Sequence, residues 1–179
     1  SDDAGVQKQL LFGPAASTYN AGRSKLEVNS TGGIVLRGNP DGTAHTLIDM
    51  LAGSTYYTFV DSGAFTAAYS SFTNADPGGL QLSGNKGIAI SSSTFDFLGF
   101  ASGTNTYITM RDLTTPATFY DVTFALSRSS YNFASAYNAR VEGSDAALAP
   151  VFRKSGAALG QMWGEANDED ASNKVAWES

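Results

Sequence analysis

The chain has 179 residues, a formal net charge of -6 and no cysteine. This length suits one domain with a sizeable core, and the missing cysteines exclude disulfides, thiolate metal sites and a cysteine nucleophile. The acidic balance, with no run of lysine and arginine, argues against nucleic-acid binding, and the longest apolar runs are too short for membrane insertion.

The polar residues of the chain are mostly uncharged. Charged side chains make up 16% of the residues, against roughly a quarter in typical domains, and serine, threonine, asparagine and glycine fill the difference. A neutral polar surface of this kind is typical of extracellular β-proteins. We therefore predict an extracellular or cell-surface location, of bacterial type.

In chain order, three segments differ in pattern. Residues 1–20 contain one apolar stretch, at residues 8–12, which we interpret as part of an N-terminal cap or as a strand exchanged with a neighbour. Residues 21–142 repeat regularly. Residues 143–179 combine a last repeat with an acidic segment that predicts a C-terminal cap. Because no linker separates these segments, we expect residues 1–179 to form a single domain.

An internal repeat dominates the middle of the chain. Residues 21–38 align without a gap with residues 67–84, and both copies contain Gly-Gly followed by an apolar-x-apolar pattern. The copies are offset by 46 residues, and at half that distance, 23 residues, apolar side chains recur in three series if a short insertion is allowed near residues 101–104. The series are Ile34/Leu36, Tyr57/Phe59, Leu80/Leu82, Ile108/Met110 and Tyr131/Phe133; Phe65, Ile88 and Ala117; and Leu26, Phe72, Phe95 and Phe124.

Apolar positions spaced by two within each repeat indicate strands, and the repeat length leaves room for three short ones. Turns such as Asp76-Pro77-Gly78-Gly79 separate them, because proline fixes φ and glycine supplies a positive φ. The sequence therefore predicts an all-β, right-handed, single-stranded parallel β-helix of about six coils. Coils stack about 4.8 Å apart, so Phe72, Phe95 and Phe124 should form an internal stack. An antiparallel sandwich is the alternative. It does not explain why the same 23-residue spacing recurs in all three series of apolar residues.

Two stretches resemble a known family. The segment Gly87-Ile88-Ala89-Ile90-Ser91-Ser92-Ser93-Thr94-Phe95 resembles coils of the pectate-lyase-like, right-handed β-helix superfamily. The ending, from Trp163-Gly164-Glu165 to Asn173-Lys174-Val175-Ala176-Trp177, is similar to the close of β-helix modules in large bacterial surface proteins. The resemblance covers roughly residues 20–177 and implies the fold. It does not fix a function, because this superfamily includes lyases, hydrolases, adhesins and phage fibres.

Catalytic candidates are few. His45 is the only histidine, and no nucleophile-elbow pattern accompanies it. Asp61 and Asp112 each follow a predicted strand, two coils apart, at about 10 Å by the strand spacing. This is near the upper limit for the two carboxylates of an inverting glycosidase. Arg111 beside Asp112 is a faint match to the basic residue that the resemblance implies for lyases.

Metal-binding candidates lie in the acidic tail. Glu165, Asp168 and Asp170 supply oxygen ligands of the kind that calcium prefers. Their spacing matches no EF-hand loop, and an acidic, solvated turn is the favoured explanation. We expect no cofactor, with calcium as the alternative.

A line of uncharged polar residues is expected on one outer face of the solenoid. It contains Thr58, Gln81, Thr109 and Asn132, each placed between two predicted inward positions. Their hydroxyl and amide groups could lie along a polysaccharide. Ordinary β-propensity on a solvent face gives the same residue types.

Taken together, the sequence predicts a non-catalytic structural or adhesive module of a surface protein or extracellular fibre. The expected partners are neighbouring domains or further copies, which would associate through the open ends of the solenoid. A polysaccharide lyase or glycoside hydrolase is the first alternative, and a glycan-binding module without catalysis is the second.

Overall fold

The computed structural model describes residues 6–13, 24–51, 55–84, 86–96, 104–126, 136–143, 149–156 and 159–179. These residues form three sheets. Sheet 1 contains β1 (Gln9–Phe12), β4 (Thr46–Met50), β7 (Ser70–Thr73), β10 (Thr94–Asp96) and β13 (Thr123–Ala125). Sheet 2 contains β2 (Ser24–Val28), β5 (Tyr56–Asp61), β8 (Ala75–Gly84), β11 (Asn105–Leu113) and β14 (Ala136–Glu142). Sheet 3 contains β3 (Gly33–Arg37), β6 (Ala64–Ala68), β9 (Ile88–Ser91), β12 (Ala117–Tyr120), β15 (Val151–Arg153) and β16 (Ala176–Glu178).

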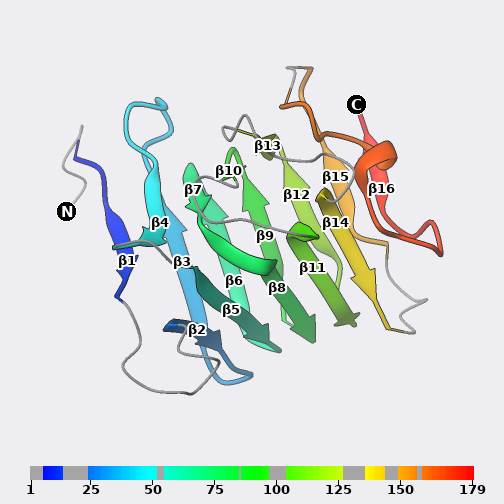
Figure 1. The fold of residues 1–179 in the computed structure, drawn as a ribbon, viewed down its shortest axis with the longest axis horizontal. Coiled ribbons are helices and arrows are strands. Elements are labelled where there is room, and N and C mark those ends of the chain that lie inside the picture. Colours follow the sequence, from blue (N-terminus) through cyan, green and yellow to red (C-terminus); the bar gives the residue numbers. More distant parts are fainter. Residues whose placement is uncertain are drawn as a thin grey trace.

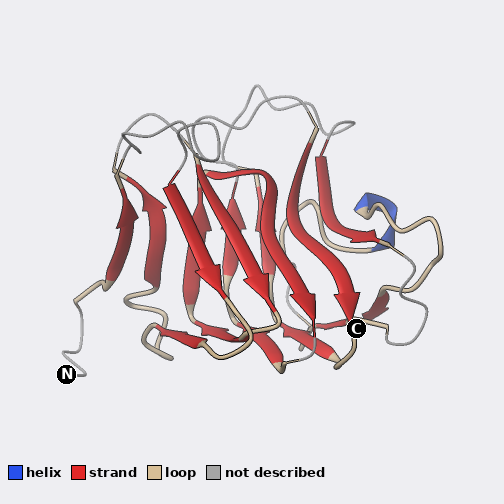
Figure 2. Ribbon diagram, turned by 90° about the horizontal axis from the view of Figure 1, so that it is seen from below, coloured by secondary structure: helices blue, strands red, loops and turns tan. Residues whose placement is uncertain are grey.

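The strands follow one another through the three sheets in rotation. From β1 to β15 the chain visits sheet 1, sheet 2 and sheet 3 in turn, five times, and β16 adds a further strand to sheet 3. Every strand pairing in the described residues is parallel. Figures 1 and 2 show the strands side by side along the long axis, from β1 at one end to β16 at the other. The predicted all-β parallel β-helix is confirmed.

Alternation of side chains along each strand builds the core. In β5 the buried and half-buried residues alternate, from buried Tyr56 to buried Val60, because successive side chains point to opposite faces of a strand. The inward positions are filled by large apolar side chains, and Phe65, Phe119 and Phe152 are fully buried. The inside of the solenoid is therefore a packed core.

The expected aromatic stack is present. Phe72, Phe95 and Phe124 are register partners on β7, β10 and β13. The rings of Phe72 and Phe95 are stacked with centroids 4.7 Å apart, and those of Phe95 and Phe124 are 6.1 Å apart. A second stack joins Phe152 to Phe119 at 4.2 Å and to Trp177 at 4.4 Å.

The 23-residue period is a property of the middle coils only. It separates Phe65 from Ile88 and Phe72 from Phe95, but 31 residues separate Ile34 from its partner Phe65. The predicted alignment of residues 21–38 with residues 67–84 is therefore wrong in three dimensions. Turns of unequal length connect the strands, so one spacing cannot describe every coil.

Five expected members of the series are placed differently. Ile34 and Leu36 lie on sheet 3 and not on sheet 2 with Leu80 and Leu82. Leu26 lies on sheet 2 opposite Thr58, not on sheet 1 with Phe72. Tyr57 and Phe59 are outward, half-buried positions of β5, whereas Thr58 and Val60 point inward. This is the one-residue slip that moves a whole strand pattern to the opposite face.

The later coil is also longer than expected. Ile108 and Met110 pair with Ala139 and Val141 of β14. The predicted partners Tyr131 and Phe133 lie outside the described residues. The predicted pairing of Ile108 and Met110 with Leu80 and Leu82 is confirmed, and their predicted pairing with Tyr131 and Phe133 is wrong.

Residues 159–178 form an irregular sixth coil that covers the C-terminal edge of each sheet. The Phe124 amide donates to the Leu159 carbonyl at 3.0 Å on sheet 1, and the Val141 amide donates to the Glu169 carbonyl at 3.2 Å on sheet 2. On sheet 3, β16 pairs with β15. Gly160 has φ +88°, and a Cβ there would overlap the Phe124 carbonyl oxygen, so only glycine permits this close approach.

The opposite end of the solenoid is built from β1, β2 and β3, the outermost strands of their sheets. The apolar stretch expected in residues 8–12 forms β1, which pairs with β4 of the same chain. The helices in the described part are too short and too polar to cross a membrane.

Candidate functional site

The outer face of sheet 2 carries a shallow hollow of about 150 Å³. Four neighbouring strands, β5, β8, β11 and β14, contribute to it. The lining side chains that point outward are Tyr57, Phe59, Gln81, Thr109, Arg111 and Glu142. Strand register brings them together, since Phe59, Gln81 and Thr109 are partners on consecutive coils.

One side of the hollow is aromatic. The rings of Tyr57 and Phe59 lie 6.4 Å apart and are tilted by 30°. The Lys25 ammonium lies 6.0 Å from the centre of the Tyr57 ring and forms an ion pair with Glu27 at 2.5 Å. Two half-buried rings on the same face of the sheet offer an aromatic surface for the apolar face of a ligand.

The other side of the hollow carries charged side chains, which form ion pairs with one another. Arg111 forms an ion pair with Glu142, its register partner on β14. Arg140 contacts Glu142 at 3.5 Å and Glu169 at 2.5 Å. The hydrogen bond that Arg111 donates to the Glu142 carboxylate raises the pKa of the Arg111 guanidinium. These pairs are solvent-accessible, so each contributes little to stability, and the charges of opposite sign balance one another.

The predicted ligand surface is only partly present at this site. Gln81 and Thr109 line the hollow, although Thr109 is buried and its hydroxyl donates to the Gly78 carbonyl at 2.8 Å. Asn132 lies outside the described residues. Thr58 is 1% exposed, so its predicted outward orientation is wrong.

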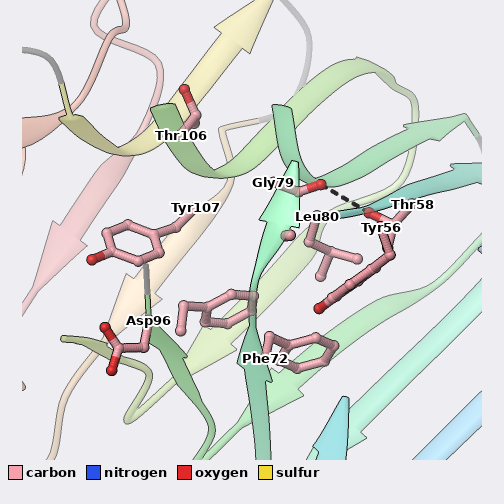
Figure 3. A pocket seen from close by; sticks show the side chains of 10 residues that line it. Tyr56, Thr58, Phe72, Gly79, Leu80, Asp96, Thr106 and Tyr107 are labelled. Atoms are coloured by element: carbon pink, nitrogen blue, oxygen red, sulfur yellow. Dashed lines mark hydrogen bonds between the residues drawn. The ribbon is translucent and has the colours of Figure 1, made fainter. Parts of the chain in front are cut away.

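Figure 3 shows why Thr58 tolerates burial. Its hydroxyl donates to the Gly79 carbonyl at 2.8 Å, inside the solenoid. The predicted turn Asp76-Pro77-Gly78-Gly79 is a bulge within β8, where the register with β5 shifts between Tyr56 and Thr58. The bulge supplies a carbonyl acceptor, which removes the cost of an unpaired buried hydroxyl.

The cavity drawn in Figure 3 lies in the core between sheets 1 and 2. Its volume is about 10 Å³ and its walls include Tyr56, Phe72, Leu80 and Phe95. This volume holds about one water molecule. The cavity is therefore a packing defect and not a ligand pocket.

The carboxylates considered for catalysis are not equivalent in the structure. Asp61 has Ser83 as its register partner, and Ser83 has Arg111. Asp112 follows Arg111 within β11, at a shift of the register with β8, and has φ +51°. Asp61 is thus aligned with Arg111 and not with Asp112, contrary to the spacing expected from the sequence. A catalytic role for Asp61, Asp112 and Arg111 stays the alternative to the prediction of a non-catalytic protein.

The single histidine, His45, is half-buried and directly precedes β4 of sheet 1. His45 Nδ1 is 3.2 Å from the Ser71 hydroxyl, and its ring meets Tyr69 edge-on at 6.5 Å. These contacts hold the ring against the neighbouring coil.

The acidic tail shapes the sixth coil. Asp170 accepts hydrogen bonds from the amides of Ser172 at 3.2 Å, of Val175 at 2.7 Å and of Lys174. Asp168 accepts one from the Trp177 indole at 2.8 Å, and Glu165 begins the 3₁₀ helix η3 (Glu165–Asn167). In the part of the chain that the structure describes, no three acidic or histidine side chains are grouped to hold a metal ion.

Asp168→Asn is expected to change stability in a pH-dependent way. Burial raises the pKa of the Asp168 carboxyl above 3.8, the Trp177 hydrogen bond opposes the rise, and the charges of Asp170 and Glu165 add to it. The folded protein therefore binds this proton more tightly than the unfolded chain, and the group adds stability as the pH falls from neutral toward about 4. Asparagine keeps the acceptor oxygen and removes the charge.

The Asp168→Asn variant should therefore gain stability relative to wild type at pH 7 and lose that gain near pH 4. Urea unfolding at both pH values measures the difference. An effect of equal size at the two pH values would show that the carboxyl charge is not responsible. Asp41→Asn, at an exposed turn outside the C-terminal coil, is the control, because the pKa of Asp41 is lowered by its hydrogen bonds with Thr43 and its variant should show the opposite trend.

In comparisons with known proteins, no family model, no curated sequence and no solved structure matched the chain. The site is therefore argued from its own residues. Sequence reasoning missed Tyr57, Phe59 and Glu142. The first two were expected in the core, and Glu142 joins the hollow only through a coil longer than the assumed period.

Proposed function

We propose that the chain is a non-catalytic structural module of an extracellular surface protein, with the β-helix as its rigid body. The observation that carries the proposal is the continuous packing of the core across coils, from Phe72 through Phe124, together with the irregular coil that covers the C-terminal edges. A solenoid with register-stacked side chains resists bending because each coil contacts its neighbours along three sheets.

The resemblance to β-helix modules of large bacterial surface proteins supports this role. Residues 87–95 and the tryptophan-containing ending supply the resemblance, and in the structure that ending lies in the sixth coil. Trp163 and Trp177 meet edge-on at 5.0 Å, and Lys154 lies 5.9 Å above the Trp163 ring. A covered edge is what a module needs if it is not to pair with other chains.

The structural role is tested by assaying the purified chain against neutral and acidic polysaccharides. We expect no release of reducing ends and no unsaturated product at any pH between about 4 and 9. Electron microscopy of the same sample should show short rods and no long filaments. Turnover that is lost in Asp61→Ala or Asp112→Ala would replace this proposal with the lyase or hydrolase alternative.

A specific observation favours glycan binding as a second function. The hollow on sheet 2 combines the Tyr57 and Phe59 rings with the Gln81 amide and a neutralised arginine–glutamate pair. Aromatic faces bind the apolar side of a sugar ring, and amides bind its hydroxyl groups. Because the charges are paired, the hollow suits a neutral saccharide better than an acidic one.

The glycan-binding function is tested by calorimetric titration with neutral and acidic oligosaccharides. Tyr57→Ala should weaken binding of the neutral ligand at least about tenfold, or about 1.4 kcal/mol. Tyr120→Ala is the matched control, since Tyr120 is an exposed tyrosine on sheet 3, away from the hollow. Equal affinity of the Tyr57→Ala variant and wild type would place any bound glycan elsewhere.

A further inference from the structure

The turn between β2 and β3 contains a short motif that the proposed function does not use. Its sequence is Asn29-Ser30-Thr31. An asparagine followed by any residue except proline, and then by serine or threonine, is the acceptor motif for N-linked glycans, and it is expected in surface loops of secreted proteins. Asn29 is the only asparagine in the sequence with a serine or threonine two positions later. The motif therefore singles out one residue as a candidate for modification.

The structure places the motif on the surface. Asn29, Ser30 and Thr31 are all exposed, and Figure 1 shows their turn at the lower edge of the molecule, between the end of β2 and the start of β3. The Gly32 amide donates to the Asn29 carbonyl at 2.9 Å, as in a β-turn. The Ala64 amide of the next coil donates to the Gly32 carbonyl at 3.1 Å. The motif is thus held in a defined turn that a second protein can reach.

The side-chain amide of Asn29 is exposed, whereas its main chain is packed. A Cβ on Gly63 would lie only 2.8 Å from the Asn29 carbonyl oxygen, so the next coil contacts the main chain of the turn. In the side chain, Oδ1 accepts a hydrogen bond from the Thr31 hydroxyl at 3.1 Å. Asn29 Nδ2 forms no hydrogen bond with another described residue. The nitrogen to which a glycan is attached is therefore free within the described part of the chain.

An acidic residue precedes the motif. Glu27 is two residues before Asn29, and side chains two residues apart on an extended strand point to the same face. Its side chain is 45% exposed and forms an ion pair with Lys25 at 2.5 Å. Oligosaccharyltransferases of bacteria recognise an acid at this position in addition to the three-residue motif. The turn therefore suits glycan transfer to a surface protein of bacterial type.

We propose that Asn29 is an acceptor site for an N-linked oligosaccharide. This inference rests on the extracellular location proposed above, because the transfer accompanies export. The donor is an oligosaccharide linked to a lipid diphosphate. Asn29 Nδ2 forms a bond to the anomeric carbon of the first sugar and gives up one proton to a base of the transferase. The bond between that carbon and the diphosphate oxygen breaks, and the lipid diphosphate leaves with the electron pair.

The test is glycan transfer to the purified, folded chain. The chain is incubated with a bacterial oligosaccharyltransferase and its lipid-diphosphate-linked oligosaccharide, and is then digested with trypsin. Cleavage after Lys25 and Arg37 releases residues 26–37 as one peptide, in which Asn29 is the only asparagine. Mass spectrometry should find this peptide heavier by the mass of the oligosaccharide, with the addition located on Asn29.

Variants within the turn separate the motif from the fold. Ser30→Pro and Thr31→Ala should both abolish the modification, whereas Thr31→Ser should retain it, because serine supplies the same hydroxyl. Thr31→Ser keeps the comparison valid if the proline variant fails to fold. Glu27→Gln should lower the modified fraction with the bacterial enzyme. It should have no effect with a single-subunit transferase that needs only the three-residue motif.

Arg140→Thr is the matched control for exposure, assayed with the transferase that needs only the motif. It completes the same motif at Asn138 and removes only solvent-accessible ion pairs, which contribute little to stability. Asn138 is fully buried, and its Nδ2 donates to the carbonyls of Met162 at 2.6 Å and Gly164 at 2.8 Å. In the folded variant Asn138 should stay unmodified while Asn29 is modified.

Two results would overturn the inference. One is an unmodified Asn29 with both transferases. The other is modification of Asn138 in the folded Arg140→Thr variant, because the motif would then be sufficient without an exposed turn. Neither result bears on the structural role of the β-helix. Polysaccharide turnover would remove that role and would leave the result at Asn29 unchanged.

Discussion

Phe95→Ala is expected to lower the free energy of unfolding by about 3–5 kcal/mol, the usual cost of truncating a buried phenylalanine. Phe95 is 2% exposed and stands between Phe72 and Phe124 in the stack on sheet 1. Removing its ring leaves a void between two coils, and the neighbouring rings cannot close it without breaking strand register. Guanidinium unfolding followed by circular dichroism measures the loss.

The matched control for Phe95→Ala is Phe95→Leu, which keeps most of the buried volume and should lose much less stability. Tyr120→Ala, at a position that is 46% exposed, should change stability by less than about 0.5 kcal/mol. A loss below about 1 kcal/mol for Phe95→Ala would mean that the stacked core does not hold adjacent coils together. The same series in a double-mutant cycle with Phe72→Ala isolates the ring–ring contribution.

The fold was predictable because its strongest signals are local. Apolar alternation within strands and short turns between them hold over the middle coils, where Phe65 and Ile88, and Phe72 and Phe95, are partners at the expected spacing. Parallel stacking of equivalent residues then follows from the repeat itself. These observations required no knowledge of the longer coils.

The register outside the middle coils was not predictable, because turn lengths carry no periodic signal. One residue of slip exchanged the roles of Tyr57 and Thr58, which placed an aromatic side chain of the outer hollow in the expected core. A polar inward residue such as Thr58 is compatible with the core only because a bulge in the next strand brings the Gly79 carbonyl to it. A sequence pattern does not show such a bulge.

The acidic tail illustrates the same limit. Its oxygen-rich composition suits a cation site, but the structure gives its acids hydrogen-bond donors from the chain itself. Asp170 caps the turn before β16, and Asp168 holds the Trp177 indole. The C-terminal edges of β13, β14 and β15 are therefore covered by a coil that these acids shape.

Trp177→Ala is expected to destabilise the protein by about 3 kcal/mol and to cause self-association. Trp177 stacks on fully buried Phe152 at 4.4 Å and meets Trp163 edge-on at 5.0 Å. Its loss uncovers Phe152 and loosens β16, so that the edge of β15 becomes free to pair with another chain. Urea unfolding gives the stability change, and light scattering over a range of protein concentrations gives the association state.

Trp177→Phe separates the two interactions of this side chain, which are the stacking on Phe152 and the hydrogen bond to Asp168. Phenylalanine retains the stacking on Phe152 and loses only the hydrogen bond to Asp168, which should cost about 1 kcal/mol without association. If Trp177→Ala stayed monomeric at every concentration, the sixth coil would not be what keeps the C-terminal edge from pairing. The stacked indole therefore explains how the irregular sixth coil is held against β15.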